Sequence, residues 1–189
     1  MKKFGVYSIT RSAVMAAVLI ICGFVKFQMP GLMVMTTLQV FAVLLIGLLL
    51  SPREAVAAVS IYVLIGLIGI PIFTRGGGIG TLATYEGGYI VGFIVCAFTE
   101  SAALALLAKA KLHFLLKRSV AVLVGIIALY AIALPYITVI VRMNGVTLSG
   151  SIISIFCLSY LQLDLIKAAA AVAVSQGLSN ALTKAGLLK

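Results

Sequence analysis

The chain has 189 residues, of which 63% are hydrophobic and only 10% are charged. About a quarter of the residues of a soluble domain are charged, so this composition excludes an ordinary soluble protein and predicts one solvated by lipid. The formal net charge of +10 would suit a nucleic-acid-binding protein, but the basic residues fall in short clusters between apolar runs, as membrane topology produces. We therefore expect one membrane-embedded domain over residues 1–189 and no binding of nucleic acid.

Six apolar segments predict an all-α integral membrane protein with six transmembrane helices. Backbone polar groups cannot stay unpaired in lipid, so helices are the expected form of such runs. Each run approaches the roughly 20 residues that cross a bilayer core, although the second is short. In chain order the predicted spans are Ile9–Val25, Thr37–Leu50, Ala55–Ile72, Tyr89–Ala108, Ser119–Val141 and Leu161–Leu182.

The basic residues are unevenly divided between the two sides of these spans. With the N-terminus in the cytoplasm, ten Lys and Arg residues lie on the cytoplasmic side and three on the outer side, with Lys167 inside the membrane. This bias predicts that both termini are cytoplasmic. The cytoplasmic set is Lys2, Lys3, Arg11, Arg53, Lys109, Lys111, Lys117, Arg118, Lys184 and Lys189, and the outer set is Lys26, Arg75 and Arg142.

The three outer loops, over residues 26–36, 73–88 and 142–160, are longer than the inner ones. The second contains a glycine-rich run over residues 76–80 that lacks the Lys-Ser/Thr ending of a P-loop. We expect its glycines to let the loop fold tightly against the bundle or a ligand. The third contains the apolar stretch 151–159, for which we expect a short helix lying on or dipping into the outer face. Elaborate loops on one side favour ligand binding there.

The chain contains four acidic residues, and for two of them we expect an ordinary structural role. Glu54 is expected to pair with Arg53 in a cytoplasmic turn, and Glu100 to hydrogen-bond to a neighbouring helix. Asp164 and Lys167 lie three residues apart and project from one face of the sixth helix. A charge at membrane depth costs about 2.5–3.5 kcal/mol on insertion scales, so it usually faces a partner or a cavity. The pair is either a structural ion pair or part of a ligand pocket.

The fourth acidic residue, Glu86, flanks the second outer loop together with Arg75. Exposed loop charges commonly have no specific role. Here they lie close in sequence to the glycine-rich run and to the aromatic residues Phe73, Tyr85 and Tyr89. These residues are therefore candidates for a pocket wall.

No constellation for covalent chemistry is present in the sequence. There is one His, no cluster of metal-ligating residues, no Gly-x-Ser-x-Gly, no Cys–His pairing and no nucleotide fingerprint. The sequence thus favours binding or transport over catalysis, with no cofactor and no metal. Ala13 and Ala17 have the small-xxx-small spacing that permits close helix approach in membranes.

Several motifs resemble those of the BioY proteins. Met35-Thr36-Thr37-Leu38-Gln39 resembles the Pro-Val-Thr-Leu-Gln entry to the second helix of that family. The run 61–73 is similar to its Tyr-Leu-Leu-Leu-Gly-x-x-Gly-x-Pro-Val-Phe signature, and a glycine-rich loop and Gly87-Gly88-Tyr89 follow in the same order. Asp164-Leu165-Ile166-Lys167 is similar to its sixth-helix Asp-x-x-Lys motif. The resemblance covers nearly the whole chain.

The resemblance implies a transport subunit rather than an enzyme. BioY proteins are the substrate-binding S components of energy-coupling factor (ECF) transporters for biotin, found in prokaryotic plasma membranes. Such a component binds the vitamin from outside and associates with a transmembrane T component and two cytoplasmic ATPases. ATP hydrolysis then drives its reorientation in the membrane. Ala13 and Ala17 match the small-residue face that docks on the T component.

The resemblance also implies roles for the candidate site residues. Asp164, with Glu86, would accept hydrogen bonds from the ureido N–H groups of biotin, and Lys167 or Arg75 would neutralise its carboxylate. Aromatic rings would pack on the bicyclic ring system. The aromatic candidates are Phe73, Tyr85 and Tyr89, and Gln39 completes the substrate-binding set.

Two departures from the family pattern leave the cargo open. Thr84-Tyr85-Glu86 stands where the family usually has Gly-Pro-Thr, and Gln162-Leu163 where it has Pro-Gly. One alternative cargo is lipoate, which would leave Asp164 without ureido donors. A stand-alone secondary transporter, a channel, a small membrane enzyme and a structural scaffold are further alternatives. Repeated halves, as many secondary transporters have, are not evident in the sequence.

Overall fold

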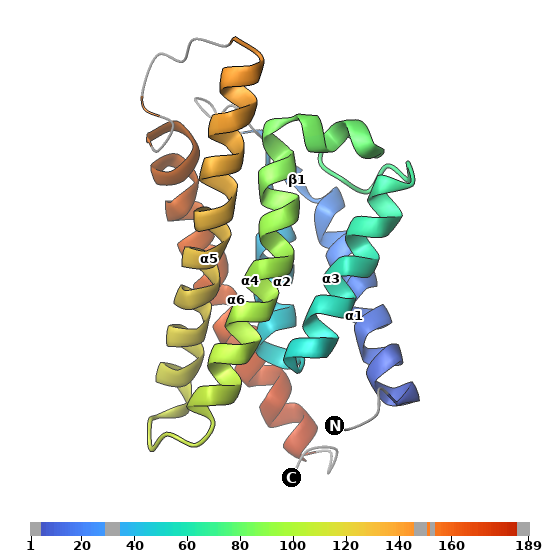
Figure 1. The fold of residues 1–189 in the computed structure, drawn as a ribbon. Helices are drawn as coiled ribbons and strands as arrows, with labels where there is room; N and C mark the ends of the chain where they lie inside the picture. Colours follow the sequence, from blue (N-terminus) through green and yellow to red (C-terminus); the bar gives the residue numbers. More distant parts are fainter. Residues whose placement is uncertain (1–4, 29–34, 146–150, 152–153, 185–189) are drawn as a thin grey trace.

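The computed structural model describes residues 5–28, 35–145, 151 and 154–184, and within them the chain forms a bundle of six α-helices (Figure 1). Two short antiparallel strands join the first two helices, and a 3-10 turn and a π-helical turn precede the fourth and sixth. Lys2, Lys3 and Lys189, which we counted as cytoplasmic charges, lie outside the described residues. The elements are α1 (Val6–Phe24), β1 (Lys26–Phe27), β2 (Thr36–Thr37), α2 (Gln39–Leu49), α3 (Pro52–Leu67), η1 (Ile79–Ala83), α4 (Tyr85–Leu107), α5 (Phe114–Met143), η2 (Ser154–Leu158) and α6 (Ser159–Lys184).

The start of α1 and the end of α6 lie at the same end of the bundle, which we call the terminal end (Figure 1). The opposite end, here the distal end, carries η1, the start of α4 and the end of α5.

The helices differ in length, and the shorter ones are the better enclosed. Within the described residues, α1, α4, α5 and the segment Ile155–Ala181 are long and apolar enough to cross a membrane. The second helix, α2, has only 11 residues, or about 16 Å at 1.5 Å per residue. Nine of those residues are buried, because α1, α4 and α6 pack around it. A helix enclosed by protein need not match the bilayer thickness.

Helices α4 and α5 pack most closely, and glycines allow their approach. A Cβ added at Gly92 would lie 2.7 Å from the side chain of Leu129, and one at Gly88 would lie 2.9 Å from the backbone of Ala133. Small residues at helix crossings are the usual means of close packing in membranes. The result is a rigid pair of helices that positions the distal half of α4.

The loop after α3 folds back over the end of that helix. Gly76 and Gly78 have positive φ angles of 123° and 97°, which favour glycine. The Gly78 N–H donates to the Gly66 carbonyl at 2.7 Å, and a Cβ at Gly66 would collide with the ring of Phe73. That ring stacks edge-on against Tyr62 with centroids 5.5 Å apart. The prediction that the glycines let this loop fold against the bundle is confirmed.

The predicted pairing of Glu54 with Arg53 is wrong. Glu54 forms a capping box at the start of α3, and its carboxylate accepts from the Ser51 N–H at 3.0 Å. This geometry turns the carboxylate toward α1, where Arg11 forms an ion pair with it at 3.6 Å. Arg11 also donates to the Leu49 carbonyl at 2.8 Å. The cap and the ion pair together fasten α1 to the turn between α2 and α3.

The prediction that Glu100 hydrogen-bonds to a neighbouring helix is also wrong. Glu100 is fully buried, and neither carboxylate oxygen has a hydrogen-bond partner among the described residues. Its carboxyl lies against Gly47 of α2 and Gly125 of α5. The two glycines make room for the carboxyl group but offer it no side-chain donor.

The described part of the stretch 151–159, for which we expected a short helix on or dipping into the outer face, forms a helical turn continuous with α6. Residues 154–158 make a π-helical turn that leads directly into α6, and Phe156 within it is fully buried. Residues 152–153 lie outside the described residues. The apolar character of this stretch reflects burial against the bundle, because Phe156 packs with Ala133 and Ile137 of α5.

Candidate functional site

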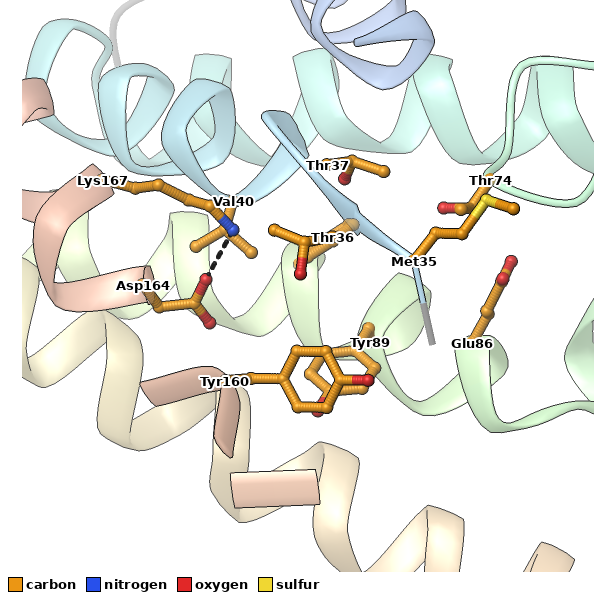
Figure 2. Close-up of a pocket in the computed structure, with 11 residues that line it drawn as sticks. Met35, Thr36, Thr37, Val40, Thr74, Glu86, Tyr89, Tyr160, Asp164 and Lys167 are labelled. Atoms are coloured by element: carbon orange, nitrogen blue, oxygen red, sulfur yellow. Dashed lines mark hydrogen bonds and ion pairs between the residues drawn. The ribbon is translucent and has the colours of Figure 1, made fainter. Parts of the chain in front are cut away.

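A small pocket lies in the distal half of the bundle, between β2, the start of α2, the start of α4 and the first turns of α6 (Figure 2). Its volume is about 60 Å³. Asp164 and Lys167 lie at one end, Glu86 and Thr74 at the other, and Thr36, Tyr89 and Tyr160 between them. The lining residues are Met35, Thr36, Thr37, Val40, Thr74, Glu86, Tyr89, Phe93, Tyr160, Asp164 and Lys167.

Asp164 and Lys167 form a buried ion pair with 2.8 Å between Lys167 Nζ and Asp164 Oδ1. Only 4% of the Asp164 side chain and 12% of the Lys167 side chain are exposed. The second carboxylate oxygen, Oδ2, accepts from the Tyr130 hydroxyl of α5 at 2.8 Å. An ionised carboxylate offers about four acceptor positions, so Asp164 keeps acceptor capacity toward the pocket. Asp164 and Lys167 thus share one face of α6, as their spacing predicts, and both line the pocket.

Glu86 lies in the first turn of α4, which Thr84 caps by accepting from the Glu86 N–H at 3.3 Å. The cap turns the Glu86 side chain inward, and the residue is only 5% exposed. Arg75 Nε lies 3.2 Å from its Oε1, with 56% of the Arg75 side chain exposed. Among the described residues neither Glu86 oxygen has a well-aligned hydrogen bond. Glu86 therefore presents a buried, under-satisfied carboxylate to the pocket.

Two tyrosine rings form one wall of the pocket. The Tyr89 ring lies 6.4 Å from that of Tyr160 and 6.2 Å from that of Tyr130, centroid to centroid. The Tyr89 hydroxyl donates to the Phe156 carbonyl at 2.7 Å, which ties η2 to α4. The predicted role of Tyr89 as an aromatic surface for a ligand fits this placement.

Gln39 lies behind the pocket rather than in its wall. Its Oε1 accepts from the Thr37 hydroxyl at 2.9 Å and from the Thr74 hydroxyl at 3.3 Å, and its Nε2 donates to the Tyr62 hydroxyl. Thr37 and Thr74 both line the pocket. Gln39 thus positions two lining residues, and our prediction that it contacts the substrate directly is not supported by its position.

Three other predicted residues also lie outside the pocket wall. Phe73 is 1% exposed because its ring packs on Tyr62 and fills the space above Gly66. Tyr85 stacks on Phe156 instead, with ring centroids 5.3 Å apart. Arg75 reaches the site only through Glu86. The two aromatic residues hold the loops in place, because their rings pack on Tyr62 and Phe156.

The predicted site lacks several residues that line the pocket, two of which helix spacing could have indicated. Tyr160 precedes Asp164 by four residues and lies on the same face of α6. Phe93 follows Tyr89 by four residues on α4 in the same way. Thr36 belongs to the motif at the entry to α2, and its hydroxyl is buried without a hydrogen-bond partner among the described residues. Buried unsatisfied groups are uncommon in native proteins, so Thr36 and Glu86 make this pocket a candidate for ligand binding.

Ala13 and Ala17 lie on the exposed side of α1. The buried side of the helix carries Ser12, Ala16, Leu19 and Gly23, and the Ser12 hydroxyl donates to the Glu54 carbonyl at 3.1 Å. The alanines therefore remain available to a surface outside this chain.

The protein-family comparison decides the assignment, because the model of the BioY family matches residues 1–184. The chain belongs to the BioY family. Among the similar proteins, the probable biotin transporter BioY of Lysinibacillus sphaericus is 33% identical over 84% of each chain. The probable biotin transporter BioY of Pyrococcus horikoshii is 32% identical over 76% of this chain and 80% of that protein. These relatives are named as transporters and not as enzymes.

The BioY assignment also agrees with a solved structure. The crystal structure of the biotin S component of an ECF-type ABC transporter matches with a TM-score of 0.79 at 26% identity. The match covers 93% of this chain and 92% of that one. The predicted fold, an S-component-like bundle of membrane helices, is thereby confirmed, and the protein is a multi-pass membrane protein of the BioY family.

Proposed function

We propose that this BioY protein is the high-affinity biotin-binding S component of an ECF-type uptake transporter in a prokaryotic plasma membrane. Both termini would be cytoplasmic, as the distribution of basic residues predicts, so the distal end and its pocket would face outward. The observation that carries the proposal is the composition of this pocket. The pocket combines an ion pair, a buried carboxylate, a buried hydroxyl and an aromatic wall. Relatives of this chain are named biotin transporters.

Biotin has the groups that such a pocket complements. Its ureido ring carries two N–H donors and a carbonyl acceptor, the fused thioether ring is apolar, and the side chain ends in a carboxylate. The free acceptor capacity of Asp164 suits the N–H donors, Lys167 suits the carbonyl, and Tyr89 offers a flat apolar surface. Lipoate lacks N–H donors and would leave Asp164 without a ligand partner.

Ligand entry requires the lining side chains to move. The pocket volume of about 60 Å³ is well below the roughly 300–1,000 Å³ of ordinary ligand sites. Met35, immediately before β2, lines the pocket and is 43% exposed. We expect the Met35 side chain to move aside when biotin enters.

The binding proposal is tested by titrating the purified protein with biotin. Asp164→Asn and Lys167→Ala are compared with the wild type, and Glu54→Gln, an acid removed at the terminal end, is the matched control. We expect the two pocket variants to lose at least a hundredfold in affinity and the control to bind as the wild type does. Unchanged affinity in both pocket variants would remove these residues from the site. Competition by lipoate equal to that by biotin would favour the alternative cargo.

The partner proposal concerns a T component and two ATPases, with Ala13 and Ala17 in the docking face. Small exposed residues on α1 permit a second helix to approach closely. Replacing both alanines by leucine should abolish co-purification with the T component and ATPases while biotin binding stays intact. Loss of neither, or loss of both together, would contradict this role for the α1 face.

A further inference from the structure

Glu86 and two cations form a second polar cluster at the distal mouth of the pocket. Arg75 forms its ion pair with Glu86 at 3.2 Å, and the positive charge of Lys26 also acts on the same carboxylate. Lys26 Nζ donates to the Thr74 carbonyl at 2.7 Å, and Thr74 is a lining residue. The two cations thus lie on the solvent side of Glu86, at the end of the pocket opposite Asp164 and Lys167.

The two ends of the pocket differ in net charge. Asp164 and Lys167 neutralise each other at 2.8 Å. At the mouth, Arg75 and Lys26 carry two positive charges against one negative charge on Glu86, a surplus of one. These charges favour one orientation of a ligand with a single carboxylate. Its ring lies at the Asp164 end, and its carboxylate lies at the mouth, beside Lys26 and Arg75.

Glu86 already forms an ion pair with Arg75, the cation that a ligand carboxylate at the mouth would need. Its side chain is buried and points into the pocket beside Thr74 and Met35 (Figure 2), so it cannot withdraw into water when a ligand arrives. An incoming carboxylate must share Arg75 with Glu86, and two carboxylates at one guanidinium repel each other. An uncharged carboxamide in the same place meets no such repulsion and can donate to Glu86, whose two oxygens keep acceptor capacity beside the contact with Arg75.

We propose that Glu86 is a specificity-determining residue that suppresses the preference of the pocket for a ligand carboxylate, so that the protein accepts biotin carboxamides alongside free biotin. The inference rests on the proposed function and deepens it by extending the ligand class. Thr is usual at this place in the family pattern described above, so the property is expected of this chain in particular.

The test compares biotin and biotinamide on the same purified protein in detergent at pH 7, using displacement of one labelled biotin probe. We expect the wild type to bind the two ligands within about threefold of each other. In Glu86→Gln the preference for biotin over biotinamide should rise at least tenfold, because Arg75 is released to the ligand carboxylate. Glu86→Thr should show the same shift if the glutamine variant does not fold. Arg75→Gln should shift the preference the other way, and Glu54→Gln should leave it unchanged.

Two results would overturn the inference while leaving the proposed function intact. An equal loss of affinity for both ligands in Glu86→Gln would mean that Glu86 contacts the shared ring system. A preference that stays within threefold of the wild-type value would mean that Glu86 does not act on the carboxylate end. Failure of the wild type to bind either ligand would overturn the proposed function, and this inference with it.

Discussion

The two ion pairs at the ends of the pocket are built differently. Asp164 and Lys167 belong to one helix, are 4% and 12% exposed, and are held by a third group, the Tyr130 hydroxyl. Glu86 and Arg75 join a helix to a loop, and more than half of the Arg75 side chain is in solvent. A buried pair that a third group holds in place is preorganised and costly to break, whereas a pair with one partner largely in solvent is easier to separate. The inner pair is thus suited to fixed recognition, and the outer pair to exchange with a ligand.

The largest effect is expected from breaking the inner pair. Lys167→Met leaves Asp164 as an uncompensated buried charge, which should destabilise the protein by about 3–5 kcal/mol and abolish biotin binding. The double variant Asp164→Asn with Lys167→Met should recover most of the stability without recovering binding. Thermal unfolding in detergent and biotin titration measure the two quantities. A double variant as unstable as Lys167→Met alone would show that the pair does not act as a unit.

The next largest effect is expected from the group that holds the inner pair. Tyr130→Phe removes the hydroxyl that donates to Asp164 Oδ2 at 2.8 Å and leaves the ring against Tyr89. A hydrogen bond to a charged group contributes about 1.5–3 kcal/mol, so stability should fall by that amount and biotin affinity by roughly tenfold. Tyr136→Phe, which removes a hydroxyl bonded to the Leu82 carbonyl outside the pocket lining, is the matched control. Equal biotin affinity in Tyr130→Phe and Tyr136→Phe would count against a role for Tyr130 in positioning Asp164.

A smaller effect is expected from the outer pair. Arg75→Ala removes the half-exposed partner of the buried Glu86 carboxylate, which keeps the charge of Lys26 nearby. The unfolding temperature should fall, but by less than in Lys167→Met, because Arg75 itself is already largely in solvent. Biotin binding should become less dependent on salt, because one screened attraction at the mouth is lost. Titrations at low and high salt measure this difference, and an unaltered salt dependence would place the ligand carboxylate away from Arg75.

The inner pair could be predicted from the sequence and much of its surroundings could not. Spacing alone puts Asp164 and Lys167 on one helix face, and the cost of charge in a membrane marks them as special. Nothing in the sequence of α5 shows that Tyr130 points at Asp164, because that contact depends on the packing of α5 against α6. For the same reason the sequence does not show that Tyr85 and Phe73 pack on other rings outside the pocket lining. An aromatic residue near a motif can face the ligand or fix the loop, and only tertiary packing decides which.

The smallest effect on biotin binding is expected from a third ion pair, far from the pocket, which resembles the outer pair in exposure. Arg11 is 51% exposed and Glu54 8% in this pair at the terminal end. Burial raises the pKa of Glu54, but hydrogen bonds from Ser51 and Ser8 and the charge of Arg11 outweigh it, so the pKa lies below its ordinary value of 4.5.

A lowered carboxylate pKa stabilises the folded state above the unfolded-state pKa, and this contribution is lost as pH falls through the folded-state value. The wild type should therefore exceed Glu54→Gln in stability by about 0.5–1 kcal/mol at pH 7 and at pH 5.5, and the gap should narrow as pH falls below about 4.5. Unfolding temperatures of both proteins between pH 7 and 3.5 measure it. A gap that does not narrow between pH 5.5 and 3.5 would show that the ionised Glu54 carboxylate is not its source. Since Glu54 lies outside the pocket, Glu54→Gln should leave biotin affinity unchanged. Comparison with Arg75→Ala then separates what a half-exposed ion pair contributes to folding from what it contributes to ligand binding.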